Sequence, residues 1–343
     1  SARRSMLAVQ VDAARIYRES LNLKGVVVED TETAAVKYPW VRDYWFKAVP
    51  LGLNKLTALH AAYWRGGFVL RVAENVKLTV PIQICFIVSS SRRAQMPHSV
   101  VVAEPGAEVH ILSGCTAPLA VSGSVHIGLT EIYVKKGAKV VSTMIEYWPH
   151  ETHSRPIKGV IVEEGGEYVE NLVILRPGSS IQAYPTVVLR GRRASTVMRA
   201  IGVATGRSDV DLGEAAYLLG EESSARLINR MVAKDEARVK QRSKAWGRAR
   251  GSRAYVECSG IILGEKASLA TYPSLVADHS DAELYHESAV GRVAEDQLVY
   301  LMSRGFTEEE AIALIVNGFL DPGILDLPEP IKKQVSEALA RMI

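Results

Sequence analysis

Residues 176–239 repeat one short pattern, a turn of small or charged residues followed by an apolar stretch: RPGSSI (176–181), GRRASTV (191–197), GRSDVDL (206–212), EESSARL (221–227) and KDEARV (234–239). One reference position from each unit gives intervals of 13 to 15 residues: Ser180, Ala194, Asp209, Ser224 and Ala237. Segments such as PTVVLR, rich in β-branched residues, lie between the turns and favour strands. A constant interval is typical of a solenoid, whose equal coils stack in register.

The pattern continues on both sides, with the reference positions Ala107, Ala138, Gly166, Ser252, Ala267 and Ala282. The first two intervals, 31 and 28 residues, are twice the unit length and indicate about two units per coil. An antiparallel sandwich also has turns every 8–12 residues, but without a constant spacing. A left-handed solenoid needs a hexapeptide repeat, which is absent. The sequence therefore predicts a mainly β protein with a right-handed parallel β-helix over residues 76–290, with the four corner alanines 107, 194, 267 and 282 in its turns.

The two ends of the chain have a different pattern. Residues 1–75 suggest a mixed segment with helices at 5–21, 33–46 and 53–65 and strands at 25–30 and 68–72. Residues 291–343 suggest a helical domain, in which Gly305 ends one helix and Thr307 with Glu310 forms a capping box that starts the next. Because an open coil leaves backbone groups unpaired, we expect these segments to cover the solenoid ends and any remaining bare edge to mediate dimerisation.

Composition narrows the possible functions. The net charge is 41 − 38 = +3 and 48% of residues are hydrophobic, which excludes disorder and gives no argument for binding nucleic acid or a membrane. No phosphate-binding loop motif occurs, so the sequence predicts no ATP site of its own. Three widely spaced cysteines, Cys85, Cys115 and Cys258, make no disulfide framework and suit a reducing cytoplasm.

Cys258 is the strongest candidate for chemistry. On its own it is an ordinary buried cysteine of a coil interior. About two repeat units later come His286 and Glu287, and stacked strands are only about 4.8 Å apart. A thiolate, an imidazole and a carboxylate on successive coils predict part of an iron or zinc site, although neighbouring residues of a strand face opposite ways.

Other candidates are weaker. Cys115, in SGCTAP, has no base at a fixed spacing and reads as a structural turn rather than a nucleophile. His150 and His153 lack the HExxH pattern and its helix. Acidic pairs of the glycosidase type cannot be singled out, although carbohydrate enzymes do use β-helices.

An ordered series of motifs is similar to the SufB/SufD family, scaffold proteins of the Suf system for iron–sulfur cluster assembly. The motifs are SGCTAP (113–118), EYWP (146–149), YPTVVLRG (184–191), CSGIILG (258–264), HESAVGRV (286–293) and the tail GRVAEDQLVYLMSRGFTEEEAIALIVNGF (291–319). The GCTAP and HE elements resemble the SufB branch, and the shorter chain suggests an archaeal, homodimeric type.

The resemblance implies a β-helix core, a second SufB/SufD-like chain as partner, and a C-terminal domain that docks the ABC-type ATPase SufC. It implies that Cys258, Glu287 and His286, in this order of importance, hold the growing iron–sulfur cluster. We expect Phe306, Phe319 and Leu320 to be exposed anchors for the ATPase. No cysteine occurs between Cys115 and Cys258, and the sequence leaves open the sulfur donor, the cluster type and any need for a flavin.

The main hypothesis is therefore a non-enzymatic scaffold for iron–sulfur cluster assembly. One alternative is a β-helix lyase or hydrolase acting on carbohydrate, for which the helical tail has no evident use. Another is an interaction protein that binds the ATPase without holding a cluster.

Overall fold

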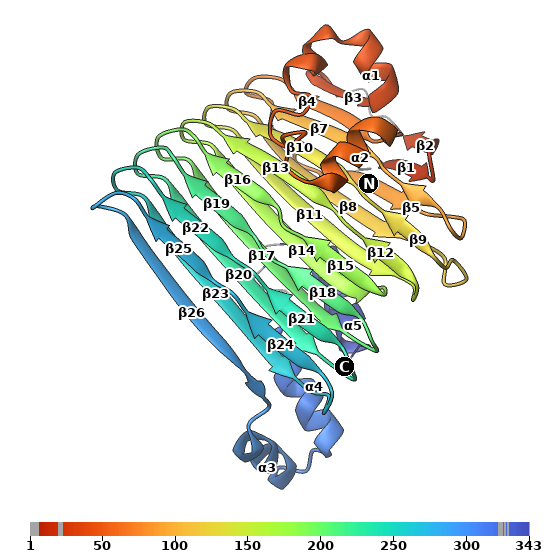
Figure 1. Ribbon diagram of the computed structural model, residues 1–343, viewed down its shortest axis with the longest axis vertical. Helices are drawn as coiled ribbons and strands as arrows, with labels where there is room; N and C mark the ends of the chain where they lie inside the picture. The colour runs from red at the N-terminus through yellow and green to blue at the C-terminus, as the bar shows by residue number, and fades with distance from the viewer. Residues whose placement is uncertain (1–6, 20–22, 322–324, 326, 328, 343) are drawn as a thin grey trace.

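The computed structural model describes residues 7–19, 23–321, 325, 327 and 329–342. The chain winds into a parallel β-solenoid of about eight turns (Figure 1). A complete coil has one long strand and two short ones, as in β14 (Glu167–Pro177), β15 (Ser180–Ala183) and β16 (Thr186–Leu189). The predicted parallel β-helix is thus confirmed as the core of the molecule.

The strands form three sheets, of which the first carries the long strands. Sheet A contains β2 (Ala14–Glu19), β1 (Leu7–Val11), β5 (Ile82–Ile87), β8 (Glu108–Thr116), β11 (Lys139–Trp148), β14, β17 (Ser195–Ala204), β20 (Ser224–Ala233), β23 (Arg253–Ile262) and β26 (Glu283–Arg292). Sheet B contains β25 (Ser274–Ala277), β22 (Lys244–Gly247), β19 (Ala215–Leu218), β16, β13 (Ile157–Val162), β10 (Leu129–Val134), β7 (His98–Ala103), β4 (Phe68–Val72) and β3 (Val26–Asp30). Sheet C contains β24 (Ser268–Thr271), β21 (Arg238–Gln241), β18 (Asp209–Leu212), β15, β12 (Thr152–Ser154), β9 (Ser124–His126) and β6 (Ala94–Gln95).

The register of sheet A confirms two repeat units per coil. Ser195 pairs with Ser224, Ser224 with Arg253 and Arg253 with Glu283, so one coil takes about twice the predicted interval. The four corner alanines lie in the turns immediately before β8, β17, β24 and β26. Small residues occur there because the corner turns inward, and Ala107 and Ala194 are completely buried.

The N-terminal segment differs from the prediction at two places. The helix expected over 5–21 is wrong where residues are described: β1 and β2 form an antiparallel hairpin that extends sheet A through β5, while residues 5, 6, 20 and 21 lie outside the described part. Leu7, Val9 and Val11 alternate with period two, and pairing with the edge of β5 outweighs the helical spacing.

The second difference concerns the helix expected over 33–46. It ends early, as α1 (Thr31–Lys37) followed by a 3-10 turn (Pro39–Asp43), because proline lacks the N–H and restricts the residue before it. The other predicted elements are present as β3, α2 (Lys55–Tyr63) and β4.

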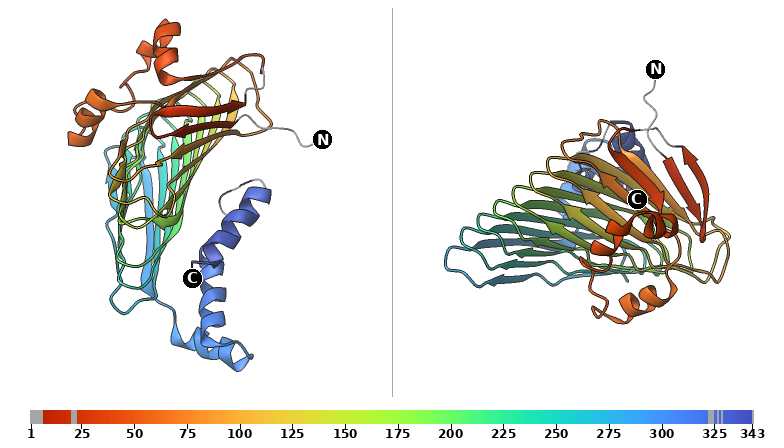
Figure 2. Two further views of the ribbon diagram at one scale, coloured as in Figure 1. Left: turned by 90° about the vertical axis from the view of Figure 1, so that its right-hand side faces the viewer. Right: turned by 90° about the horizontal axis from the view of Figure 1, so that it is seen from above.

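The C-terminal helices are α3 (Glu295–Ser303), α4 (Glu308–Phe319) and α5 (Glu329–Ala340). The helices α4 and α5 lie along the outer face of sheet A, and α3 lies beyond the end of β26 (Figure 2). The Thr307–Glu310 capping box of α4 is present as predicted. Buried side chains of α4 and α5 pack against Val173, Ile201 and Val232 of the sheet. The last predicted helix, over 328–343, is α5, and residues 328 and 343 lie outside the described part. Among the described residues, no helix is long and apolar enough to cross a membrane.

Candidate functional site

Cys258 lies inside the solenoid, one coil before its C-terminal end. Its side chain is completely buried and joins the core that fills the interior. The Cys258 Sγ lies 3.5 Å from the Ser243 Oγ. Burial raises the pKa of the Cys258 thiol to about 11, the carboxylates of Glu214 and Glu257 act in the same direction, and the Ser243 hydrogen bond opposes them. The group at rest is therefore a thiol, and a bound metal would have to displace its proton.

The strand register separates the two polar residues that follow in β26. Cys258 pairs with Ser288, Glu257 with Glu287 and Val256 with His286. Since side chains alternate along a strand, His286 faces the interior, as Cys258 does. Glu287 faces outward, where its carboxylate accepts a hydrogen bond from the Tyr255 hydroxyl at 2.7 Å. Stacking of the two coils thus places Cys258 and His286, rather than Cys258 and Glu287, on a common face.

The interior is open at this end of the solenoid. The strands β24, β25 and β26 are the last of their sheets, and no further coil among the described residues covers them. His286 and Ser288 are consequently exposed although they face inward. The Ser288 hydroxyl donates to the Cys258 carbonyl at 3.0 Å, so a single layer of side chains separates the thiol from this opening.

Several buried polar residues surround Cys258 that the sequence analysis did not single out. Asn229, its register partner on β20, and Gln241 on β21 are completely buried. The Gln241 Nε2 donates to the Asn229 Oδ1 at 3.1 Å. Ser243 Oγ donates to Glu214 Oε2 at 2.9 Å. The sequence feature that could have identified these residues is a polar side chain at a position of the repeat that faces the interior. That feature can be recognised only when the coil register is known.

The remaining sequence candidates lie elsewhere. Cys115 is buried toward the opposite end of the interior, and burial together with Glu146 raises the pKa of its thiol. Cys85 is half-buried on β5, and its thiol pKa is raised by burial. The His153 Nδ1 lies 2.8 Å from the Ser180 Oγ. Within the described ranges, no three His, Cys, Asp or Glu residues are arranged to hold a metal ion.

The three expected ATPase anchors differ in exposure. Phe306 is 41% exposed, in the turn between α3 and α4, whereas Leu320 is only 1% exposed. Phe319 packs against the same core as Leu320, between the tail and sheet A. The expectation of an exposed anchor is therefore wrong for Leu320, because this residue attaches the tail to the solenoid.

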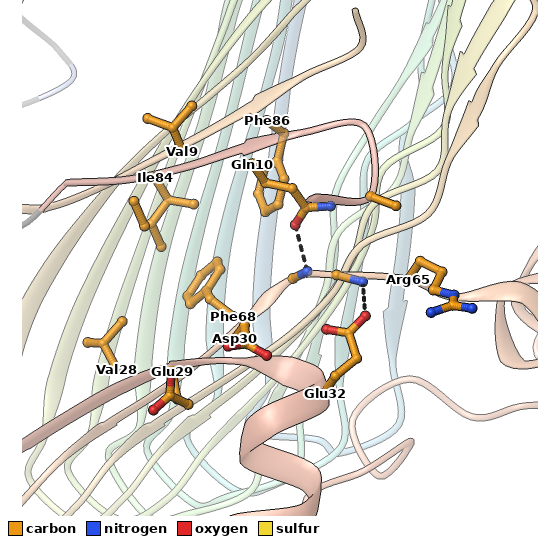
Figure 3. Close-up of a pocket in the computed structure, with 14 residues that line it drawn as sticks. Val9, Gln10, Val28, Glu29, Asp30, Glu32, Arg65, Phe68, Ile84 and Phe86 are labelled. Atoms are coloured by element: carbon orange, nitrogen blue, oxygen red, sulfur yellow. Dashed lines mark hydrogen bonds between the residues drawn. The ribbon is translucent and has the colours of Figure 1, made fainter. Parts of the chain in front are cut away.

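A cavity of about 400 Å³ opens at the N-terminal end of the solenoid (Figure 3). Its apolar wall includes Val28, Phe68 and Phe86. At its rim, the side chains of Gln10 and Glu32 accept hydrogen bonds from the backbone N–H groups of Gly67 and Gly66. These contacts fasten the β1 hairpin and α1 to β4. The described residues that line the cavity include no cysteine or histidine, and the cavity lies at the end of the solenoid away from Cys258.

The fold and site define a class of protein: a parallel β-solenoid with a buried thiol beside its open end and a helical tail on its outer face. Residues 86–319 match the family model described as the SufBD core domain of the SUF system for FeS cluster assembly. The chain belongs to the SufBD family.

Named relatives agree. The chain is 38% identical over 328 residues to an iron–sulfur cluster assembly SufBD family protein of Pyrococcus horikoshii, covering 94% of this chain and 73% of that protein. It is 35% identical over 316 residues to a SufBD family protein of Archaeoglobus fulgidus, with coverages of 92% and 85%. It is 31% identical over 331 residues to the iron–sulfur cluster assembly protein SufB of Bacillus subtilis, with coverages of 94% and 70%. Family membership supports a role in iron–sulfur cluster assembly rather than carbohydrate chemistry.

Proposed function

We propose that this chain is a non-enzymatic scaffold on which an iron–sulfur cluster is built as cargo. The observation that carries the proposal is the position of Cys258, a free thiol directed into the interior beside the open end of the solenoid. Iron–sulfur clusters are held mainly by thiolates, and His286 adds an imidazole on the same face. Glu287 is reachable only from the outer face and has a lesser role. Free thiols suit a reducing compartment such as the cytoplasm.

The proposed assembly contains two SufBD chains. One chain supplies a single cysteine near the opening, so the cluster needs donors from a second one. The terminal strands β24, β25 and β26 have no partner on their outer edges within the described part of the chain. Such edges pair readily with another chain. Pairing of two open ends would cover exposed interior side chains such as Leu275 and Val290 and bring two sets of donors together.

The tail is the proposed docking site for a SufC-type ABC ATPase. The helix α3 has no buried residue, and Val299, Tyr300 and Met302 are each exposed by more than two fifths. Together with Phe306, we call these exposed residues the α3 surface. Apolar anchors on one helix are a common means of docking into a groove. ATP hydrolysis by the partner would supply the energy for opening the assembly.

Anaerobic reconstitution of the purified chain with ferrous iron and sulfide tests the scaffold role. We expect visible sulfur-to-iron charge-transfer absorption in the wild type and in Cys85→Ser, and its loss in Cys258→Ser. Full absorption in Cys258→Ser would contradict the proposal. A chain that binds the ATPase but never takes up iron and sulfide would instead support the interaction-protein alternative.

A further inference from the structure

Glu214 is an unusual carboxylate in the solenoid interior. Its side chain belongs to a residue only 4% exposed, and within the described residues no cationic group forms an ion pair with it. The neighbouring interior carboxylate of Glu170, by contrast, is paired with the Lys158 Nζ at 2.5 Å. Burial raises the pKa of the Glu214 carboxyl to about 8, because a buried carboxyl without a cation favours its neutral form. Burying such a polar group is unfavourable compared with burying an apolar side chain, and its presence here points to a role other than packing.

A hydrogen bond that the Glu214 carboxyl accepts within the described part of the chain leads to the candidate site. Ser243 Oγ donates to Glu214 Oε2 at 2.9 Å, and Cys258 Sγ lies 3.5 Å from the same Ser243 Oγ. Both Ser243 and Cys258 are buried. The three side chains therefore form a continuous series of contacts from carboxyl to hydroxyl to sulfur. It runs across three successive coils, with Glu214 directly before β19, Ser243 directly before β22 and Cys258 on β23.

The placement of Glu214 and Ser243 in the repeat supports a specific role. Glu214 directly precedes β19 and Ser243 directly precedes β22. These two strands are paired, with Ala215 opposite Lys244. At the corresponding place of the coils on either side stand Pro185 and Pro273. The fold thus accepts an apolar, rigid residue at this corner, and polar side chains replace it in the two coils that precede the coil of β23, which contains the thiol.

We propose that Ser243 and Glu214 are positioning residues for the Cys258 sulfur in cluster assembly. The Glu214 carboxyl accepts a hydrogen bond from the Ser243 hydroxyl and so fixes the rotation of that hydroxyl. The Ser243 oxygen in turn accepts a hydrogen bond from the Cys258 thiol, which orients the sulfur before a metal displaces the thiol proton. Groups that hydrogen-bond to a metal ligand set its orientation, and their loss typically weakens metal binding 10- to 100-fold. This inference rests on the proposed function, because it assumes that Cys258 receives the cargo.

The experiment measures iron uptake by the full-length chain. Ferrous iron is titrated in the presence of sulfide, and the apparent affinity and the position of the charge-transfer band are recorded. The variants are Ser243→Ala and Glu214→Leu, which break this series of contacts, and Ser243→Thr and Glu214→Gln, which keep a hydroxyl and an acceptor oxygen. Ser252→Ala is the matched control, because the Ser252 hydroxyl is buried and makes no hydrogen bond in the described structure. Thermal unfolding checks that each variant is folded.

We expect Ser243→Ala and Glu214→Leu to bind iron about 10-fold or more weakly, with a shifted charge-transfer band. The two conservative variants and the Ser252→Ala control should resemble the wild type in both measurements. Wild-type binding by Ser243→Ala and Glu214→Leu, while Cys258→Ser fails, would overturn this inference alone. Wild-type binding by Cys258→Ser would overturn the proposed function itself. A Glu214→Gln variant as deficient as Glu214→Leu would also overturn positioning by hydrogen bonding. Ser243→Ala, which removes one oxygen atom, keeps the test decisive if Glu214→Leu does not fold.

Discussion

Cys258 and Glu287 lie on neighbouring strands of sheet A, yet their side chains point to opposite faces of the sheet. The register pairs Glu257 with Glu287 and Cys258 with Ser288. Because side chains alternate along a strand, Cys258 faces the interior and Glu287 faces outward. His286, one residue earlier than Glu287, shares the interior with the thiol. The order of importance inferred from the family resemblance, with Glu287 before His286, is therefore reversed in our predictions.

We predict that His286→Ala impairs cluster formation more than Glu287→Ala does. The imidazole faces the interior that contains Cys258, whereas the Glu287 carboxylate binds the Tyr255 hydroxyl on the outer face. Reconstitution with iron and sulfide measures the difference, and Glu287→Gln, which still accepts from Tyr255, is the control. Equal loss in His286→Ala and Glu287→Ala would show that the outer face also takes part.

Charge on the α3 surface should prevent ATPase binding without unfolding the chain. Tyr300→Asp and Phe306→Asp place a carboxylate on an exposed apolar surface, so co-purification with a SufC-type ATPase should be lost and the melting temperature should stay the same. Val36→Asp is the matched control, because Val36 is an equally apolar residue, 88% exposed, on the N-terminal helix α1. Retained binding by both α3 variants would place the ATPase elsewhere.

Shortening Leu320 should destabilise the protein, unlike the changes on the α3 surface. Leu320 is buried between α4 and sheet A, and Leu320→Ala leaves a cavity that lowers the free energy of unfolding by roughly 2–5 kcal/mol. Denaturant unfolding measures this loss. An unchanged midpoint would mean that the tail packs only loosely on the sheet.

The buried pair of Lys158 and Glu170 offers a test of interior electrostatics. The Lys158 Nζ contacts both Glu170 oxygens and, at 3.1 Å, the Ser142 hydroxyl. Lys158→Met leaves the Glu170 charge buried without its partner and should lower the free energy of unfolding by about 3–5 kcal/mol. The double variant Lys158→Met/Glu170→Met should recover much of the loss. A double variant weaker than Lys158→Met alone would contradict this account.

Acid should weaken the N-terminal part of the molecule through His60. Burial, with smaller contributions from His98 and His126, lowers the pKa of His60 from 6.5 to about 3. Between these values the unfolded chain binds a proton that the folded chain does not, so the free energy of unfolding falls as the pH falls, by about 1.4 kcal/mol per pH unit. His60→Phe should make unfolding less dependent on pH between about 6 and 4. An unchanged pH profile in His60→Phe would assign the effect to the other buried histidines of this region, His98 and His126, whose pKa values burial also lowers.

The sequence by itself determined the repeating core and the helical tail. A turn every 13 to 15 residues is a local signal with one simple solution, because equal coils must stack in register. The capping box of Thr307 and Glu310 determined the start of α4 in the same local way. The spacing of Cys258 from Glu287 correctly indicated adjacent strands, since it is about two repeat units long.

Only the tertiary structure decided which side chains meet. A shift of one residue in register moves every side chain of a strand to the other face. The coil length sets that register, and it varies from coil to coil: the register partner of Glu108 is Lys139, and that of Lys139 is Glu167. It therefore directed His286 inward and Glu287 outward. The contact of Cys258 with Ser243, and of Ser243 with Glu214, joins residues on different sheets and coils, so no local pattern contains it. The β1–β2 hairpin likewise formed because the edge of β5 was available for pairing, which outweighed the local helical spacing.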